Sequence, residues 1–365
     1  MGSPTRGAAT GSPRPPFLSR WFSLVLVTVV LTIGAAQLSI PSPGLFVALF
    51  VAVVFALAGW APASGLPKRL GIASQAVLGV EIGTLVQRDT LATLGDNWLP
   101  VVLACLGTLV LSIGAGALLG LRKDVDSLTG ALALVAGGAS GLVAIAQELG
   151  GDERVVAVVQ YLRVVLVTTT MPLVATLVFS ARGTDAVFVV TAGAPWYLDL
   201  IFVAFCAAVG YVLARLIKLP APGLLGPLIL ATVVDLLGFS FGAGVPPVLL
   251  AAAYIGIGWQ AGMRFTIESL RSISRVLPTA LLLIIGVTVG CAMLGLWLTN
   301  ATSITAYEGY LATTPGGVYA VLAVAASTGA NVTFVVAAQV IRVFMMLFAV
   351  PVGTKIVRHY RRGSG

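Results

Sequence analysis

The sequence predicts an all-α polytopic membrane protein with two inverted-topology repeats, each of about five transmembrane helices plus one re-entrant or broken double-glycine helix. Three observations support this fold class. Hydrophobic residues make up 58% of the 365 residues and charged residues only 9%, with a mean hydropathy of +1.05. Apolar stretches of roughly membrane-spanning length recur along the chain. The chain also aligns with itself when it is shifted by 179 residues.

The low charge content excludes whole classes of function. An ordinary soluble domain carries about 25% charged residues, so this chain cannot cover a water-facing surface. A soluble enzyme and a nucleic-acid-binding protein are therefore excluded. The net charge of +8 comes from basic residues that flank apolar runs, which is typical of cytoplasmic loops in membrane proteins. The lipid bilayer is the expected surrounding, with no nucleic-acid partner.

The ends of the chain differ from its middle. Residues 1–20 are rich in Gly, Pro, Ser and Arg and are predicted to form a disordered cytoplasmic tail. The next run resembles a signal peptide in its basic start and small residues, but it has a counterpart later in the chain, which favours a membrane helix. The predicted organisation is a first repeat at 21–180, a second at 196–354 and a basic cytoplasmic tail at 355–365.

Twelve apolar stretches follow one another in the sequence. A helix that crosses a bilayer needs about 20 apolar residues, so not every stretch has to cross. The predicted elements are 22–38, 44–60, 71–86, 98–121, 128–147, 155–178, 196–214, 223–240, 246–263, 277–299, 308–327 and 332–352.

An internal duplication relates the two halves. Matches of Gln, Arg, Pro and paired Gly at one offset are far less expected by chance than matches of apolar residues in such a composition. They indicate a fused-repeat membrane protein. The 179-residue shift places Pro41, Pro43 and Gly44 on Pro220, Pro222 and Gly223, Gly79 and Gly83 on Gly258 and Gly262, Gly137 and Gly138 on Gly316 and Gly317, and Gln160 and Arg163 on Gln339 and Arg342.

The distribution of basic residues predicts the orientation of the halves. If all twelve stretches cross, many Lys and Arg residues of the second half lie outside, against the positive-inside rule. If the double-glycine stretch of each half dips in and returns, each half crosses five times and the second is inverted. Nearly all Lys and Arg then lie inside, except Arg88 and Arg182. This arrangement places both termini in the cytoplasm.

The two double-glycine segments, 134–141 and 312–319, are the predicted breaks. A non-helical turn at membrane depth must be buried in protein or line a wet cavity. Paired glycines permit such a turn and a close approach of the backbone to a ligand. The alternative is that both segments are ordinary spanning helices, whose small residues allow tight packing.

Arg163 and Arg342 are unusual because each lies eight to ten residues into an apolar helix, or roughly 12–15 Å deep. An arginine at the bilayer centre costs about 2.5–3.5 kcal/mol and marks a substrate or ion path by default. Gln160 and Gln339 precede them by three residues, on the same helical face. Each arginine could hold carbonyls freed at the broken turn, pair with a buried acid, or bind an anion directly.

Half-helix N-termini that point to the midplane would add positive partial charge near these arginines. Two such ends from opposite sides suit an anion such as a carboxylate or phosphate. Hydroxyl groups are available at the same level. The predicted substrate-binding residues are Gly137, Gly138, Ser140, Gln160, Arg163, Thr313, Thr314, Gly316, Gly317, Tyr319, Gln339 and Arg342.

Few acids lie within the apolar stretches. Glu81, Asp235 and Glu308 are candidates to carry a coupling ion, H⁺ or Na⁺, or to neutralise an arginine. The three cysteines lie in apolar runs without metal-ligand spacing, and the only histidine, His359, is in the tail. We therefore expect no metal centre, no cofactor and no catalytic residues.

The motif around residues 137–172, with Gly137-Gly138-Ala139-Ser140, Gln160, Arg163 and Pro172, recurs as Gly316-Gly317, Gln339, Arg342 and Pro351. This paired motif resembles the two copies of the membrane AbrB duplication, over nearly everything after residue 21. The first copy departs from the pattern at Ala136, where the second has Pro315. The resemblance implies a bacterial inner-membrane protein and a candidate transporter, distinct from the soluble DNA-binding regulators of the same name.

Some members of that family are labelled ammonia monooxygenases or are linked to regulation of another gene. The architecture is also similar to that of sodium-coupled glutamate and citrate symporters, an analogy of fold only. The function we expect is secondary transport of a small organic anion, without enzymatic activity. A membrane sensor without transport is the alternative. A monooxygenase would need copper or iron held by His and carboxylate ligands. The coupling ion and the oligomeric state, such as a homodimer, stay open.

Overall fold

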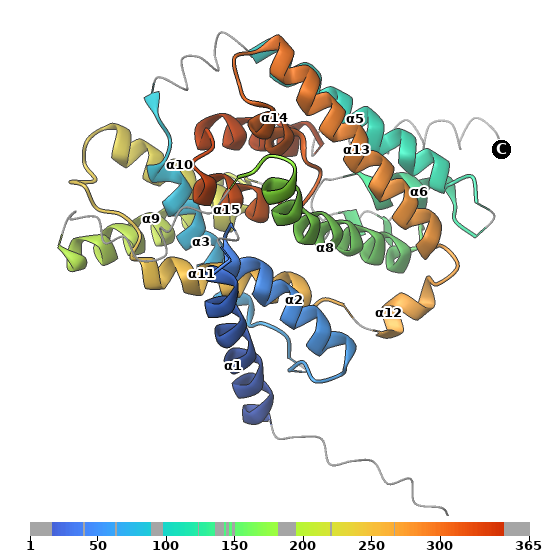
Figure 1. Ribbon diagram of the computed structural model, residues 1–365, viewed down its shortest axis with the longest axis horizontal. Helices are drawn as coiled ribbons and strands as arrows, with labels where there is room; N and C mark the ends of the chain where they lie inside the picture. Colours follow the sequence, from blue (N-terminus) through green and yellow to red (C-terminus); the bar gives the residue numbers. More distant parts are fainter. Residues whose placement is uncertain are drawn as a thin grey trace, which may run out of the picture.

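The computed structural model describes residues 17–38, 41–62, 64–88, 98–122, 124–135, 142–143, 146–147, 150–181, 195–219, 221–265 and 267–346 (Figure 1). All regular secondary structure in these ranges is helical, which confirms the predicted all-α class. Five helices are long and apolar enough to cross a membrane, so the fold is that of a polytopic membrane protein. They are α1 (Phe17–Ala36), α5 (Trp98–Leu119), α8 (Glu153–Leu177), α9 (Trp196–Leu216) and α13 (Leu277–Ala301).

The other described helices are shorter. Some are apolar helices of 10–17 residues, and others belong to the interrupted stretches around the double glycines. One short helix, α12, has no counterpart among the predicted elements. These helices are α2 (Pro43–Leu57), α3 (Lys68–Thr84), α6 (Ser127–Leu134), α10 (Pro222–Leu236), α11 (Pro247–Gly262), α12 (Ile267–Ser272), α14 (Ala306–Thr313), α15 (Val318–Thr328) and the last described helix, Val332–Met346.

The offset that aligns the sequence with itself also relates the helices. The starts of α1 and α9, α2 and α10, α3 and α11, α5 and α13, and α6 and α14 are each 179 residues apart, as are those of α8 and the last described helix. The backbone agrees in detail before α2 and α10. Ser42 (φ 47°, ψ 53°) and Ala221 (φ 46°, ψ 55°) are both left-handed and both precede a proline that begins the helix.

Glycines let helices of different halves approach closely. A Cβ atom on Gly258 of α11 would lie 2.4 Å from the Leu45 carbonyl of α2, and one on Gly79 of α3 would lie 2.5 Å from the Leu224 carbonyl of α10. These are equivalent contacts, because each position of one pair lies 179 residues from its counterpart in the other. In both pairs, contacts advance along the two chains together, so α2 is parallel to α11 and α3 is parallel to α10. Tight packing through small residues is typical of membrane helices.

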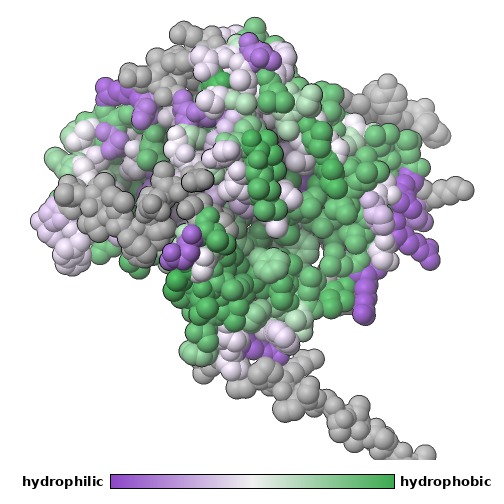
Figure 2. Space-filling view, viewed as in Figure 1, coloured by the Kyte–Doolittle hydropathy of each residue, from purple (hydrophilic) through white to green (hydrophobic). Residues whose placement is uncertain are grey.

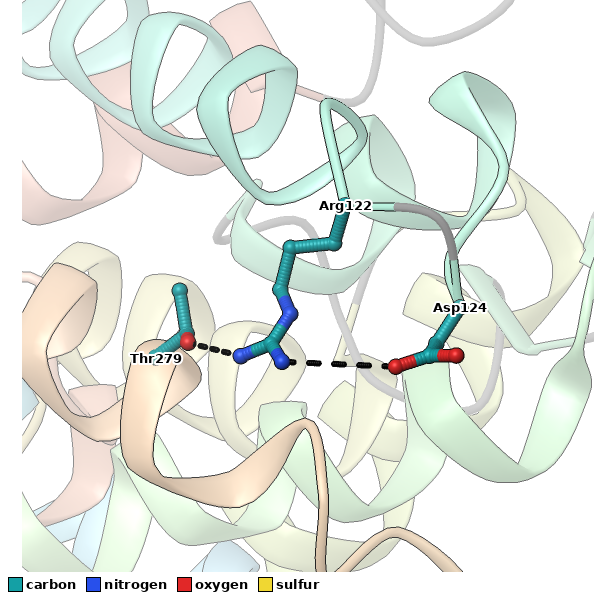
Figure 3. A network of polar contacts seen from close by, with 3 residues as sticks. All are labelled: Arg122, Asp124 and Thr279. Atoms are coloured by element: carbon teal, nitrogen blue, oxygen red, sulfur yellow. Dashed lines mark hydrogen bonds and ion pairs between the residues drawn. The ribbon is translucent and has the colours of Figure 1, made fainter.

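α5 and α13, which are equivalent to each other, pack side by side in opposite directions (Figure 1). Leu294 fills the space beside Gly107, whereas Leu111 fills the space beside Gly290. At one end of the pair, Arg122, which follows α5, donates a hydrogen bond to the hydroxyl of Thr279 in the first turn of α13 (Figure 3). The same guanidinium lies 4.0 Å from a carboxylate oxygen of Asp124.

The helices gather into two lobes, each built from both halves. The first lobe contains α1, α2, α3, α9, α10 and α11, which pack mainly on one another. The second lobe contains α5, α6, α8, α13, α14, α15 and the last described helix. The lobes meet through α15 with α3, through α8 with α2 and α11, and through a shared apolar core that includes Leu45, Leu78, Leu224, Val321 and Val335. The first three helices of each half thus form one body and the later ones form the other.

The surface is that of a protein in lipid. On α13, one face carries large exposed side chains at helical spacing, among them Leu282, Val289 and Met293, which are 57–69% exposed. The opposite face buries Ile284 and Cys291 against other helices of the second lobe. In Figure 2, apolar residues form a broad area over the middle of the visible face, with hydrophilic patches beside it. A water-soluble monomer rarely exposes an apolar area of this extent, whereas contact with lipid acyl chains accounts for it.

Candidate functional site

The double-glycine segment of the second half folds into a helical hairpin. α14 begins with a capping box, in which the Thr305 hydroxyl accepts from the Glu308 amide and a Glu308 carboxylate oxygen accepts from the Thr305 amide. α14 ends just before Pro315, which cannot continue a helix. The ends of the hairpin meet, since the hydroxyls of Tyr307 in α14 and Thr328 in α15 are 3.2 Å apart. The chain therefore returns to the level at which it started.

In the first half, one contact equivalent to those at the base of the second hairpin is described. α6 begins at the N-cap Asp126, and the Thr129 hydroxyl accepts a hydrogen bond from the Asp152 amide at 2.8 Å. In the second half, Glu308 accepts from the Asn331 amide at 2.8 Å, in the same positions 179 residues later. The predicted site residues Gly137, Gly138 and Ser140 lie between these contacts, outside the described residues.

Arg163 and Gln160 of α8 lie against the end of α6. The Arg163 Nη1 donates to the Leu134 carbonyl at 3.0 Å, and its Nη2 donates to Gln160 Oε1 at 2.8 Å. The Gln160 Nε2 donates to the carbonyls of Leu132 and Val135 at 2.9 and 2.7 Å. Carbonyls at a helix C-terminus lack intrahelical partners and carry the negative end of the helix dipole. The two side chains supply donors for these carbonyls.

Arg342 and Gln339 make the same contacts with the end of α14. The Gln339 Nε2 donates to the Leu311 carbonyl at 2.8 Å. Arg342 donates through Nη1 to the carbonyls of Thr313 and Thr314, and through Nη2 to Gln339 Oε1. These are the contacts expected if each arginine holds the carbonyls that are freed where the helix breaks before the double glycine. Anion binding by the same side chains stays a prediction.

The charge of both arginines is left without an acid. Arg163 is 5% exposed and Arg342 is 2% exposed, and neither forms an ion pair within the part of the chain that the structure describes. The Nε of each has no hydrogen-bond partner there either. Burial of charge is costly, and among the described residues only carbonyl and amide oxygens offset the charge of these two side chains.

The tip of the second hairpin packs directly on α8. A Cβ on Gly316 would lie 2.4 Å from Cγ1 of Val167, and one on Gly317 would lie 3.3 Å from Cγ1 of Val164. The paired glycines are therefore required for this close approach. Gly317 is the N-cap of α15 and offers no side-chain cap, while the Ala320 amide already donates to the Gly317 carbonyl at 2.9 Å. The amides of Val318 and Tyr319 are the first-turn donors that a ligand could use.

The predicted hydroxyl ligands are placed near this tip but are partly engaged. Thr313 donates to the Cys291 carbonyl at 2.7 Å, and Thr314 donates to the Tyr310 carbonyl at 2.6 Å. Their oxygens can still accept, but their protons are not free for an anion. Tyr319 lies in the first turn of α15 and is half-buried.

The candidate acids lie in different surroundings. Glu308 uses both carboxylate oxygens to accept backbone amides, which is a structural role at the base of the hairpin. Glu81 is half-buried on α3 near Tyr254, in the first lobe. Asp235 lies near the end of α10 and is half-buried. None of the three forms an ion pair with a described basic residue.

Sequence reasoning overlooked one polar side chain at the hairpin tip. The Thr168 hydroxyl is 3% exposed, has no partner among the described residues and lies 3.7 Å from the position of a Cβ on Gly317. The signal was present as a run of three threonines, 168–170, inside an apolar helix. In the described ranges, no three His, Cys, Asp or Glu side chains lie together as a metal site would require.

Comparisons with known proteins place the chain in a family. A family model described as "Transition state regulatory protein AbrB" matches residues 63–358. A protein of Escherichia coli K12 named "Putative regulator AbrB" is 32% identical over 342 residues, which cover 93% of this chain and 97% of that protein. The "Uncharacterized protein YhjN" of Bacillus subtilis 168 is 25% identical over 311 residues, covering 81% of this chain and 80% of that protein. The resemblance to the AbrB family is confirmed, and the chain belongs to that family.

Proposed function

We propose that this protein is a secondary active transporter of a small organic anion, with its site between the tips of two helical hairpins. The observation that carries the proposal is the pair of buried guanidiniums, Arg163 and Arg342, without a described acid partner. In the proposal, each lies at the end of a half-helix, α6 or α14, near the middle of the bilayer. α14 is 8 residues long, or about 12 Å, against about 15 Å for half of the hydrocarbon core.

The proposal includes two inverted halves with re-entrant hairpins. Three pairings support inversion. The equivalent helices α5 and α13 are antiparallel. α3 and α11 are also antiparallel, because Gly71 faces Gln260 while Ser74 faces Gly256. α2 is parallel to α11, and α10 is parallel to α3. Because α3 and α11 are antiparallel, the equivalent helices α2 and α10 also run in opposite directions. Since α5 and α13 are both candidate spans, a two-fold relation between them lies in the membrane plane.

Alternating access would come from movement between the lobes. The second lobe carries both hairpins and both arginines, and the first lobe carries neither. In the proposed cycle, one lobe moves against the other around the site, across the apolar interface that joins them. Such relative movement is the usual mechanism in transporters with internal repeats. Thr168 and the first turn of α15 would contribute donors to the bound anion.

Coupling would use H⁺ or Na⁺, with Glu81 as the first candidate carrier, because Glu308 is fully engaged in hydrogen bonds. Asp235 is the second. The proposed location is the bacterial inner membrane with both termini in the cytoplasm, as the distribution of basic residues favours. We propose no enzymatic activity.

A ligand-sensing regulator is the second candidate function. The name of the E. coli relative favours it. A sensor would use the same anion site but would bind its ligand without net movement across the membrane. Binding and uptake must therefore be measured separately.

The test is uptake into proteoliposomes of radiolabelled lactate, succinate, glutamate and phosphate, with thermal shift of the detergent-purified protein against the same anions. We expect one class of anion to raise the unfolding temperature and to accumulate. Arg163→Gln and Arg342→Gln should abolish both effects, whereas Arg215→Gln, which removes an exposed charge near the end of α9, should not. Binding without uptake would favour the sensor. Full uptake in both buried-arginine variants would remove these residues from the mechanism.

A further inference from the structure

An apolar groove of about 240 Å³ lies between the two lobes. Its walls come from α10 of the first lobe and the last described helix of the second, together with Val86, which follows α3. Ile229 and Val233 on its wall are each 47% exposed, so the groove opens at the surface. Its lining includes Leu225, Ile229, Val233, Thr333, Val336 and Phe344.

The groove is lined almost entirely by apolar side chains. Each of its two hydroxyl groups already has one partner, since the Thr232 hydroxyl donates to the Gly83 carbonyl at 3.1 Å and the Thr333 hydroxyl accepts from the Gln87 amide at 3.0 Å. The remaining lining is aliphatic, with one aromatic ring. An occupant of this groove must therefore be apolar over its whole inserted length.

The length of the groove matches one leaflet of a bilayer. From Leu225 to Val233 the α10 wall rises about 12 Å, and from Thr333 to Phe344 the opposite wall rises about 16 Å. One leaflet of the hydrocarbon core is about 15 Å thick. A single acyl chain that lies along the groove would be covered for most of its length.

A basic side chain stands at one end of this groove. Arg88 follows the lining residue Val86 by two positions and donates to the carbonyl of Leu236, which follows the lining residue Val233 by three. Arg88 is exposed and forms no ion pair with a described acid, although Asp235 precedes Leu236. Lys68 begins α3, which rises about 25 Å before it ends at Thr84, so Lys68 and Arg88 lie at opposite ends of this helix.

We propose that the groove is a binding site for an anionic phospholipid, with one acyl chain between the lobes and the phosphate against Arg88. The groove supplies the apolar length, and Arg88 supplies the complementary charge at headgroup level. Because the walls belong to different lobes, the chain would separate two bodies that move in the proposed transport cycle. The site itself requires only the geometry of the groove and holds whether or not the protein transports.

The experiment uses the full chain in nanodiscs of phosphatidylcholine with a small fraction of phosphatidylglycerol that carries a photoreactive diazirine on its acyl chain. Crosslinked peptides are identified by mass spectrometry after illumination. In the wild type, we expect label on the segment 332–346. Ala337→Phe, which fills the groove, should remove this label. Arg88→Gln should weaken binding about fivefold, which corresponds to the approximately 1 kcal/mol that one basic residue contributes at an anionic surface.

Matched controls separate the groove from general lipid contact. Val289→Phe enlarges a side chain on the lipid-facing side of α13, and Arg215→Gln removes an exposed charge at the end of α9. Both should leave the labelling of 332–346 unchanged, and the unfolding temperature of every variant is measured to establish that it is folded. Equal labelling in Ala337→Phe and the wild type would overturn the acyl-chain site. Equal labelling by diazirine-phosphatidylcholine would overturn the role of Arg88.

Discussion

The contact between α11 and α2 gives a sharp prediction about stability. A Cβ on Gly258 would lie 2.4 Å from the Leu45 carbonyl oxygen and 2.8 Å from the Leu49 amide nitrogen. Both are backbone atoms, which cannot rotate away. To restore ordinary contact, α2 must move by about 1 Å, and overpacking of this kind costs about 1–3 kcal/mol. Gly258→Ala should therefore destabilise the protein even though alanine is the better helix former.

Gly286 in α13 is the matched control, because nothing lies within 4 Å of a Cβ added there. Gly286→Ala should be neutral or should stabilise by about 0.5–1 kcal/mol, through the reduced backbone entropy of the unfolded chain. Gly79→Ala should behave like Gly258→Ala, because its Cβ would lie 2.5 Å from a carbonyl oxygen of α10.

Tryptophan fluorescence during thermal unfolding in detergent measures all three variants. A difference of about 1–4 kcal/mol between Gly258→Ala and Gly286→Ala corresponds to a few degrees in the unfolding midpoint. Equal midpoints for the two variants would refute the proposed close packing of α11 on α2. A normal midpoint for Gly79→Ala alone would refute the equivalence of the two helix pairs.

Three further predictions concern caps, carbonyl donors and acids. Asp152→Ala removes the N-cap side chain that accepts from the amides at the start of α8, so it should lower the unfolding midpoint by about 2 °C. Asp152→Asn keeps an acceptor and should stay close to wild type. Equal losses in both variants would contradict the capping role of Asp152. Gln160→Leu and Gln339→Leu each leave buried carbonyls without donors, so unfolding assays should show losses of about 1–3 kcal/mol per carbonyl; wild-type midpoints would argue against these bonds. Glu81→Gln should abolish the pH dependence of uptake, whereas Glu308→Gln should keep it, and the reverse pattern would exchange their roles.

Much of the fold could be predicted because lipid imposes simple rules on a sequence. Apolar stretches of membrane length located the long helices, and the 179-residue offset anticipated where each helix of the second half begins. The depth of Arg163 and Arg342 within their helices could be calculated from the rise per residue alone. The start of α1 at Phe17 rather than near residue 21 reflects the usual imprecision of helix ends. The short helix α12 was missed because its polar sequence carries no apolar period.

The chemistry of the candidate site was harder to predict. The sequence placed Arg163 and Arg342 in the membrane but left open whether they hold carbonyls, meet an acid or bind an anion. Only the three-dimensional contacts show that each guanidinium donates to a half-helix end while its Nε has no partner among the described residues. Likewise, Glu308 resembled an intramembrane acid, yet its carboxylate belongs to a capping box. The apolar groove between the lobes leaves no local signal, because its walls come from residues far apart in the chain.

The opposite orientation of the two halves can be measured directly with single cysteines at equivalent positions. Arg69→Cys and Val248→Cys lie 179 residues apart, and both positions are exposed at the start of a helix. They are introduced after replacement of the three buried native cysteines by alanine. A membrane-impermeant maleimide should label Arg69→Cys only from the cytoplasmic face and Val248→Cys only from the opposite face. Labelling of both from the same face would contradict the inverted arrangement and the transport mechanism built on it.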